Sequence, residues 1–237
     1  MPDPRPGPSR RSFRILLALF VALLAANAGY LALRMWRANE GMHRFSGDRQ
    51  AARTELFRRL PPDSGAIILL GDSHLEHFPL GEVFPGLPVV NRGVSASTLR
   101  DVADRVRISC GPAPALIVVH AGINDLFKHR PVERFEADLA ALLDTLRTVH
   151  PRAPVLLDEL LPTADRGMDG EVRRCNAVIH RLAGRYGVAV LPLYAAFEQR
   201  GTIDPTLTYD GVHLNAEGYD RWAALLRPVL TAPTPDP

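Results

Sequence analysis

The strongest constraint on the fold is a regular alternation of short apolar runs and longer amphipathic segments between residues 63 and 230. The apolar runs cover 66–70, 88–91, 115–120, 153–158 and 187–191. Segments with helical periodicity follow near 96–109, 132–149, 169–186 and 216–230. Strands that alternate with helices are joined by crossover connections, which give a parallel sheet covered on both faces. The pattern therefore predicts an α/β fold, a flavodoxin-like three-layer α/β/α sandwich with a five-stranded parallel sheet.

The composition fits one globular core and argues against a nucleic-acid partner. The chain has 237 residues, of which 46% are hydrophobic, enough for a single core of good size. Its formal net charge is only +2, and no basic stripe with interleaved aromatic residues occurs. We therefore expect no nucleic-acid binding.

The two cysteines, Cys110 and Cys175, are far apart and outside any metal-binding spacing. They could form one disulfide if the domain is exported. Cys175 lies in the middle of a segment with helical periodicity, which favours two small buried thiols instead. We expect no metal site and no cofactor.

The first 33 residues have the pattern of a membrane-inserted segment. Residues 1–14 form a basic tail that carries four arginines, and residues 15–33 contain no charge. A helix needs about 20 apolar residues to cross a bilayer. Basic residues before the apolar run favour a cytoplasmic amino terminus. This interpretation predicts a transmembrane anchor at 15–33 and places the domain that follows it outside the cytoplasm.

A cleaved signal peptide is the alternative, because Ala26-Asn27-Ala28 resembles a cleavage site and cleavage near Ala28 would secrete the protein. The apolar run continues to Leu33, which exceeds the usual length of about 7–15 residues and favours an uncleaved anchor. Residues 34–62 then form a membrane-proximal helical linker that ends at Pro61-Pro62. The globular domain covers 63–230, and the Pro-rich residues 231–237 are expected to be disordered.

Polar residues follow the first three predicted strands at the edge where parallel sheets bind ligands. Ser73 follows the first strand in Gly71-Asp72-Ser73-His74, Gly93 follows the second, and Asn124 follows the third. Each tripeptide alone could be a turn or a helix cap. Their common position at one sheet edge favours a shared site.

Asp210 and His213 lie three residues apart before the last predicted helix. An imidazole near neutral pKa can take the proton of a serine hydroxyl, and a carboxylate can hold the ring in the required orientation. Gly211 permits a tight loop between them. We therefore predict Ser73 as nucleophile, His213 as base and Asp210 as the supporting acid.

Ester hydrolysis also requires hydrogen-bond donors for the oxyanion that develops on the substrate. The amide of Ser73, the amide of Gly93 and the side-chain amide of Asn124 are the expected donors. The Gly-x-Ser-x-Gly motif of α/β-hydrolases is absent, because Leu75 occupies the second glycine position.

Four blocks in order resemble the SGNH hydrolase (GDSL esterase/lipase) superfamily, over residues 64–230: Gly71-Asp72-Ser73, Asn91-Arg92-Gly93, Gly122-Ile123-Asn124-Asp125 and Asp210-Gly211-Val212-His213. The pattern is most similar to the small esterases around platelet-activating-factor acetylhydrolase subunits. The resemblance implies the same catalytic and oxyanion residues, a flavodoxin-like fold and no cofactor. Ile123 replaces the threonine that often precedes the asparagine.

These observations predict an exported, membrane-anchored serine esterase. Its substrates would be short acyl or acetyl esters, for example on envelope glycans, because no long apolar insertion could serve as a lipase lid. The alternatives are a lysophospholipase or thioesterase that acts on longer chains, and a non-catalytic membrane-tethered scaffold that binds glycans.

Overall fold

The computed structural model describes residues 10–232 and divides the chain into two units, with the division between Arg49 and Gln50. The first element, α1 (Arg10–Arg59), is a helix of 50 residues that crosses this division. It ends just before Pro61-Pro62, which cannot continue a helix.

The apolar part of α1 is a candidate membrane span. Residues Phe13–Arg37 have a mean hydropathy of 2.2, and the apolar side chains within this stretch are exposed. The segment that we expected to insert, 15–33, lies inside it. By length and composition this helix fits either an anchor or a signal sequence.

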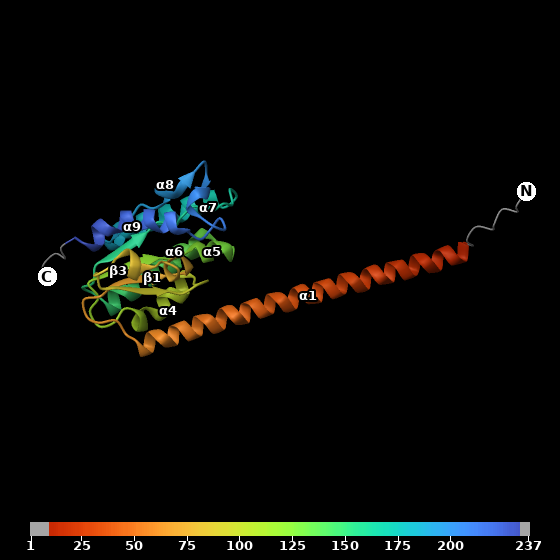
Figure 1. The fold of residues 1–237 in the computed structure, drawn as a ribbon, viewed down its shortest axis with the longest axis horizontal. Coiled ribbons are helices and arrows are strands. Elements are labelled where there is room, and N and C mark those ends of the chain that lie inside the picture. Colours follow the sequence, from red (N-terminus) through yellow and green to blue (C-terminus); the bar gives the residue numbers. More distant parts are fainter. Residues whose placement is uncertain (1–9, 233–237) are drawn as a thin grey trace, which may run out of the picture. The chain divides into compact units, whose positions relative to one another are not determined.

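The second unit contains the predicted five-stranded parallel sheet (Figure 1), which confirms the fold class. The strands are β1 (Ile67–Gly71), β2 (Val89–Gly93), β3 (Leu116–His120), β4 (Val155–Asp158) and β5 (Ala189–Leu191). Their order is β2-β1-β3-β4-β5, the flavodoxin-like arrangement. Parallel pairing aligns Gly71 with Gly93 and with His120, so the first three strands end at one edge.

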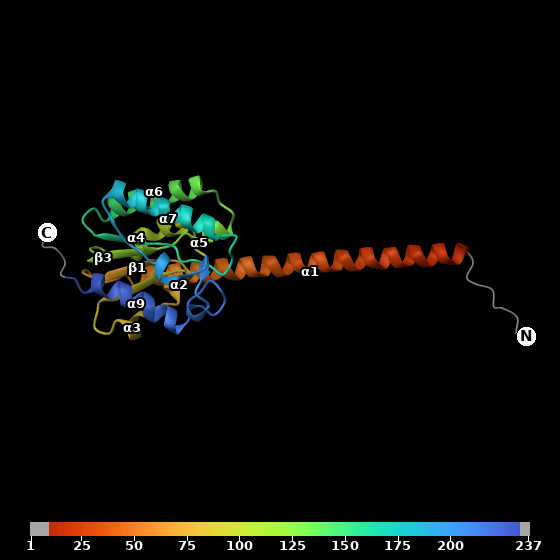
Figure 2. The same cartoon turned by 90° about the horizontal axis from the view of Figure 1, so that it is seen from above.

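Four long helices cover the two faces of this sheet, at the positions that the periodicity predicted. They are α4 (Leu99–Ser109), α6 (Val132–Val149), α7 (Asp169–Tyr186) and α9 (Ala216–Leu230). Helices α4, α6 and α7 lie on one face, and α9 lies on the other together with the short α3 (Leu80–Val83), as Figure 2 shows.

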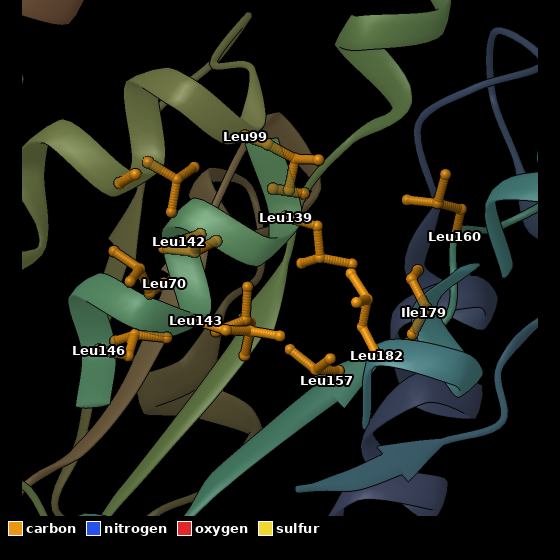
Figure 3. Packing of buried hydrophobic residues seen from close by; sticks show 14 of the residues in the cluster. Leu70, Leu99, Leu139, Leu142, Leu143, Leu146, Leu157, Leu160, Ile179 and Leu182 are labelled. Atoms are coloured by element: carbon orange, nitrogen blue, oxygen red, sulfur yellow. The ribbon is translucent and has the colours of Figure 1, made fainter. Parts of the chain in front are cut away.

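The strands are apolar on both faces because each face meets a helical layer. Ile68 and Leu70 of β1 face α4 and α6, whereas Ile67 and Leu69 face the α9 layer. Figure 3 shows Leu70 of β1 among the leucines of α6. Burying each such side chain contributes about 1.5–3 kcal/mol to stability.

Cys110 and Cys175 are both buried and unpaired, as the helical pattern favoured. Burial raises the pKa of each thiol to about 12. Neither thiol is therefore a reactive nucleophile near neutral pH.

Short elements connect the layers near the strand ends. They are α2 (Ser73–Glu76), α5 (Ile123–Phe127), α8 (Tyr194–Phe197), β6 (Glu198–Gln199), β7 (Thr202–Ile203) and the 3-10 helix η1 (Pro205–Leu207). Helices α2 and α5 directly follow β1 and β3. They place the polar residues of these strand ends at the carboxyl edge of the sheet.

Candidate active site

The turn from β1 into α2 presents Ser73. A side chain at Gly71 would lie 1.9 Å from the carbonyl oxygen of His120, so this position requires glycine for the close approach of β3. Asp72 caps α2 by accepting a hydrogen bond of 3.1 Å from the backbone N–H of His74. Ser73 is the first helical residue, and its hydroxyl reaches a histidine from the other end of the domain.

Ser73, His213 and Asp210 form a continuous hydrogen-bonded series. The Ser73 Oγ lies 3.0 Å from His213 Nε2, and His213 Nδ1 lies 2.7 Å from Asp210 Oδ2. At 3.0 Å the Ser73 hydroxyl proton can pass to the imidazole. The hydrogen bond to Asp210 holds the ring in the tautomer that can accept this proton. The predicted nucleophile, base and acid are thus brought together.

Asp210 is held in its charged form. Burial would raise its pKa, but hydrogen bonds from the His213 ring and from the N–H groups of His213 and Val212 outweigh burial, so the pKa is lowered. The two backbone donors lie 2.7 and 2.9 Å from Asp210 Oδ1. A charged Asp210 stabilises the imidazolium that forms when His213 accepts a proton.

The loop that carries Asp210 and His213 is fixed by its neighbours. Gly211 has a φ of +86°, which favours glycine, and its carbonyl accepts the N–H of Ala164 at 2.7 Å. The Thr208 hydroxyl donates to the carbonyl of His213 at 2.6 Å. The ring of Tyr209, 64% exposed, stacks beside His213 with centroids 5.9 Å apart.

A second aspartate–histidine pair lies beneath this loop and was not predicted as part of the site. His74 Nδ1 lies 3.4 Å from Asp72 Oδ1, and both side chains are almost fully buried. The other ring nitrogen of His74 donates to the carbonyl of Val212 at 2.9 Å. The residue after the serine therefore holds the peptide between Asp210 and His213.

Asp72 and His74 each stabilise the charged form of the other. Burial alone would raise the pKa of Asp72 and lower that of His74. Their mutual attraction outweighs burial, so the pKa of Asp72 is lowered and that of His74 is raised. An Asp72 carboxylate beside a His74 imidazolium results.

His120 continues this buried cluster towards Asp158, with 3.9 Å between its Nδ1 and the carboxylate. Burial lowers the pKa of His120 to about 3, so this ring is neutral near pH 7, and burial raises the pKa of Asp158 well above its ordinary value. Among residues 10–232, the ligating atoms of Asp72, His74 and His120 lie within 4.8 Å of one another, a spacing that could hold a metal ion. Our expectation of no metal site stays a prediction.

Two expected oxyanion donors have suitable surroundings. The N–H of Ser73 lies in the first turn of α2, where backbone N–H groups have no partner within the helix. Asn124 Nδ2 donates one hydrogen to the carbonyl of Ser97 at 3.0 Å. Its second amide hydrogen remains available for a substrate oxygen.

The N–H of Gly93 already donates to Asn91 Oδ1 at 2.9 Å, and its expected role as an oxyanion donor stays a prediction. Glycine is required here for another reason. A side chain at this position would lie 2.1 Å from the backbone nitrogen of Glu76, so β2 could not pack against α2. Close packing of β2 against α2 therefore accounts for the glycine at this position.

Ala96 was not among the predicted site residues. It lies on the loop between β2 and α4, beside Ser97, which binds Asn124. Its φ is +60°, the left-handed region that alanine rarely adopts. Within the described part of the chain its N–H meets no acceptor. Only the backbone angle marks this position, and a sequence does not reveal that angle.

Solved structures of other proteins have the same fold. A protein of Streptococcus pneumonia whose name refers to platelet activating factor has 23% identity and a TM-score of 0.76, covering 81% of this chain and 98% of its own. An acylhydrolase from Bacteroides fragilis has 22% identity and a TM-score of 0.66, with 75% and 93% covered. A GDSL-like lipase from Bacteroides thetaiotaomicron has 21% identity and a TM-score of 0.66, with 77% and 96% covered.

At these identities the solved structures establish the fold. No curated protein matches the chain. The profile of the GDSL-like Lipase/Acylhydrolase family, however, matches residues 74–221, more than half of the sequence. The chain therefore belongs to the GDSL-like lipase/acylhydrolase family and is an esterase-type hydrolase.

Proposed function

We propose that the protein hydrolyses carboxylic esters through an acyl-enzyme on Ser73. The observation that carries this proposal is the 3.0 Å contact of Ser73 Oγ with His213 Nε2, whose ring is held by Asp210. The serine oxygen attacks the ester carbonyl and its proton passes to His213. When the tetrahedral intermediate collapses, that proton leaves with the alcohol. His213 then takes a proton from water, whose oxygen attacks the acyl group and releases the acid.

The oxyanion formed in both steps would be bound by the N–H of Ser73, the side chain of Asn124 and the N–H of Ala96. Ala96 replaces Gly93 in this set because the N–H of Gly93 is occupied. Removing one such donor typically lowers kcat by about 10²–10³-fold.

We further propose that the substrates are short or polar esters. A cavity of about 490 Å³ adjoins Asp210 and is lined by Asp165, Glu171, Phe127 and Met168, among others. No lysine or arginine is among its described lining residues. The lining holds three carboxylates, those of Asp165, Glu171 and Asp210, and one histidine, His129. Arg174, which pairs with Glu171 at 3.8 Å, is not part of the lining. This negative balance disfavours the phosphate of a lysophospholipid or of coenzyme A, because like charges repel. A neutral, hydroxyl-rich ester such as an acetylated glycan suits this cavity better.

Export and anchoring complete the proposal. The candidate span Phe13–Arg37 follows basic residues, which favours a cytoplasmic amino terminus and a catalytic domain on the far side of the membrane. An acetyl ester of an envelope glycan would be accessible from there.

Fluorophosphonate labelling tests the nucleophile before any substrate is known. The full-length protein should be labelled, and Ser73→Ala should lose the label together with about 10⁴-fold or more of its esterase activity. Ser64→Ala, a change at an exposed turn serine, is the matched control and should behave as the wild type. Undiminished activity of Ser73→Ala would instead favour a binding role for the domain.

A series of nitrophenyl esters tests the substrate class. Turnover should be greatest with acetyl or other short acyl groups and should fall as the chain lengthens. A maximum at long acyl chains would contradict this part of the proposal and support the lysophospholipase or thioesterase alternative.

A further inference from the structure

The last turns of α1 pack as part of the catalytic unit. Gln50–Arg59 belong to this unit, and Phe57 is only 1% exposed. The Phe57 ring contacts two guanidinium groups, with Arg92 4.5 Å and Arg53 5.5 Å from its centroid. Burying a phenylalanine and stacking it against cations stabilises this attachment.

Two polar side chains of this segment bind the backbone that leads to Ala96. Arg53 Nε donates to the carbonyl of Gly93 at 2.5 Å, and its Nη2 donates to Asn91 Oδ1 at 3.3 Å. Gln50 Nε2 donates to the carbonyl of Ser95 at 2.8 Å. Helix α1 therefore donates hydrogen bonds to the peptide between Gly93 and Val94 and to the peptide between Ser95 and Ala96.

Helix α2 holds the same loop from its other side. Glu76 Oε1 lies 3.9 Å from Arg53 Nε, and Glu76 Oε2 accepts the N–H of Ser95 at 2.5 Å. The N–H of Val94 donates to the carbonyl of Gly71 at 3.0 Å. Together with the bond from the Gly93 amide, these contacts occupy every backbone N–H from residue 93 to 95.

The first free N–H after this fixed stretch is that of Ala96. Since its direction depends on the peptides that precede it, a shift of the Gly93 or Ser95 carbonyl would move it. A displacement of about 1 Å can lower a rate by about 10²-fold when it affects a reacting geometry. The contacts of Arg53 and Gln50 are thus suited to set the position of an oxyanion donor.

We infer that Arg53 and Gln50 are positioning residues of the active site, and that the end of the helix that carries the candidate span is part of the catalytic machinery. This inference rests on the proposed function, specifically on Ala96 as a donor. Arginine suits the role because its planar guanidinium donates in several fixed directions, here to a carbonyl and an amide oxygen, while its charge lies beside the Glu76 carboxylate. A lysine would supply the charge without that geometry.

Active-site titration of the full-length protein in detergent tests the inference. Fluorophosphonate counts the competent sites, and turnover of nitrophenyl acetate is then expressed per titrated site. Arg53→Gln should lower kcat per site about tenfold with little change in KM. Gln50→Ala should also lower kcat per site. Arg53→Lys should recover only part of the kcat that Arg53→Gln loses. Arg58→Gln is the matched control, because this exposed arginine pairs only with Glu55 among the described residues.

A merely structural role would reduce the number of titrated sites and leave kcat per site unchanged. That result for both Arg53→Gln and Gln50→Ala would overturn the inference. If Arg53→Gln fails to fold, Gln50→Ala alone decides in the same way. Ser73→Ala, measured in parallel, separates the two hypotheses, because activity in that variant would overturn the proposed nucleophile rather than the positioning role.

Discussion

At the scale of single residues, the reactivity of Ser73 depends on a side chain 140 positions away in the sequence. His213 is held from two sides, by the Asp210 carboxylate and, through the peptide of Val212, by the buried His74. Because His74 immediately follows the nucleophile, one short segment supplies both the serine and a support for its base. The proposed oxyanion donor Ala96 depends in addition on its own backbone, which has a left-handed φ of +60°.

We expect Ala96→Gly to stabilise the protein while it retains activity. Alanine in the left-handed region costs about 1–2 kcal/mol, and glycine removes most of this cost without removing the N–H. The free energy of unfolding of Ala96→Gly, measured by denaturation, should therefore rise by about 1 kcal/mol. Ala52→Gly, at an exposed helical position, is the control and should lose about 1 kcal/mol. Equal losses of unfolding free energy in Ala96→Gly and Ala52→Gly would contradict backbone strain at residue 96.

Asp72→Asn should destabilise the protein by about 3–5 kcal/mol near pH 6, because it leaves the buried His74 without its charge partner. The lowered pKa of Asp72 means that its contribution is lost as the pH falls through that pKa. The raised pKa of His74 means that its contribution is lost as the pH rises through that pKa. The difference between variant and wild type should thus be greatest between these two values.

Urea denaturation from pH 4 to pH 9 checks this dependence. Asp104→Asn, at an exposed carboxylate, is the control and should change stability little at any pH. A destabilisation by Asp72→Asn that stays constant across the whole range would argue that the pair is not ionic.

At the scale of elements, the site exists because three strands end at one edge and two short helices start there. Close contacts between backbones make this possible. Gly71 allows β3 to approach β1, and Gly93 allows β2 to approach α2. Asn91 joins the same elements by donating to the carbonyl of Leu75. Helix α2, the end of β2 and the loop after it therefore behave as one packed group.

Gly93→Ala should cost about 3 kcal/mol or more and impair catalysis. The added methyl group would lie 2.1 Å from a backbone nitrogen, so β2 and α2 would have to separate. Thermal unfolding and kcat together measure the effect. Gly81→Ala is the control, since a methyl group there meets no atom within 4 Å and should be neutral or slightly stabilising. Wild-type stability of Gly93→Ala would contradict this account of the contact.

At the scale of the whole molecule, one helix, α1, contains both the candidate span and the residues that bind the loop before Ala96. A signal peptide that is cut away near Ala28 would leave Gln50 and Arg53 in place. An uncleaved anchor would join them covalently to the membrane. The two alternatives therefore differ in whether the enzyme stays attached to the membrane. The proposed positioning role of Arg53 and Gln50 is common to both.

We expect the protein to remain uncleaved and to sediment with membranes. The apolar stretch exceeds the usual length of a signal peptide, which favours retention of the helix. Detergent should release the protein from membranes, whereas high salt should not. Intact mass spectrometry of the released chain decides the question, and a mass that begins just after Ala28 would establish cleavage instead.

The architecture could be predicted from the residue pattern alone, because apolar periodicity reports local burial and each strand and helix follows from its own segment. The same pattern also predicted the chemical types gathered at the sheet edge, since parallel strands must end together. The tertiary structure alone decided which backbone groups stay free. The N–H of Gly93 donates to Asn91, whereas the N–H of Ala96, a residue with a left-handed φ, meets no acceptor among the described residues. Such outcomes depend on contacts between distant segments, which no local pattern encodes.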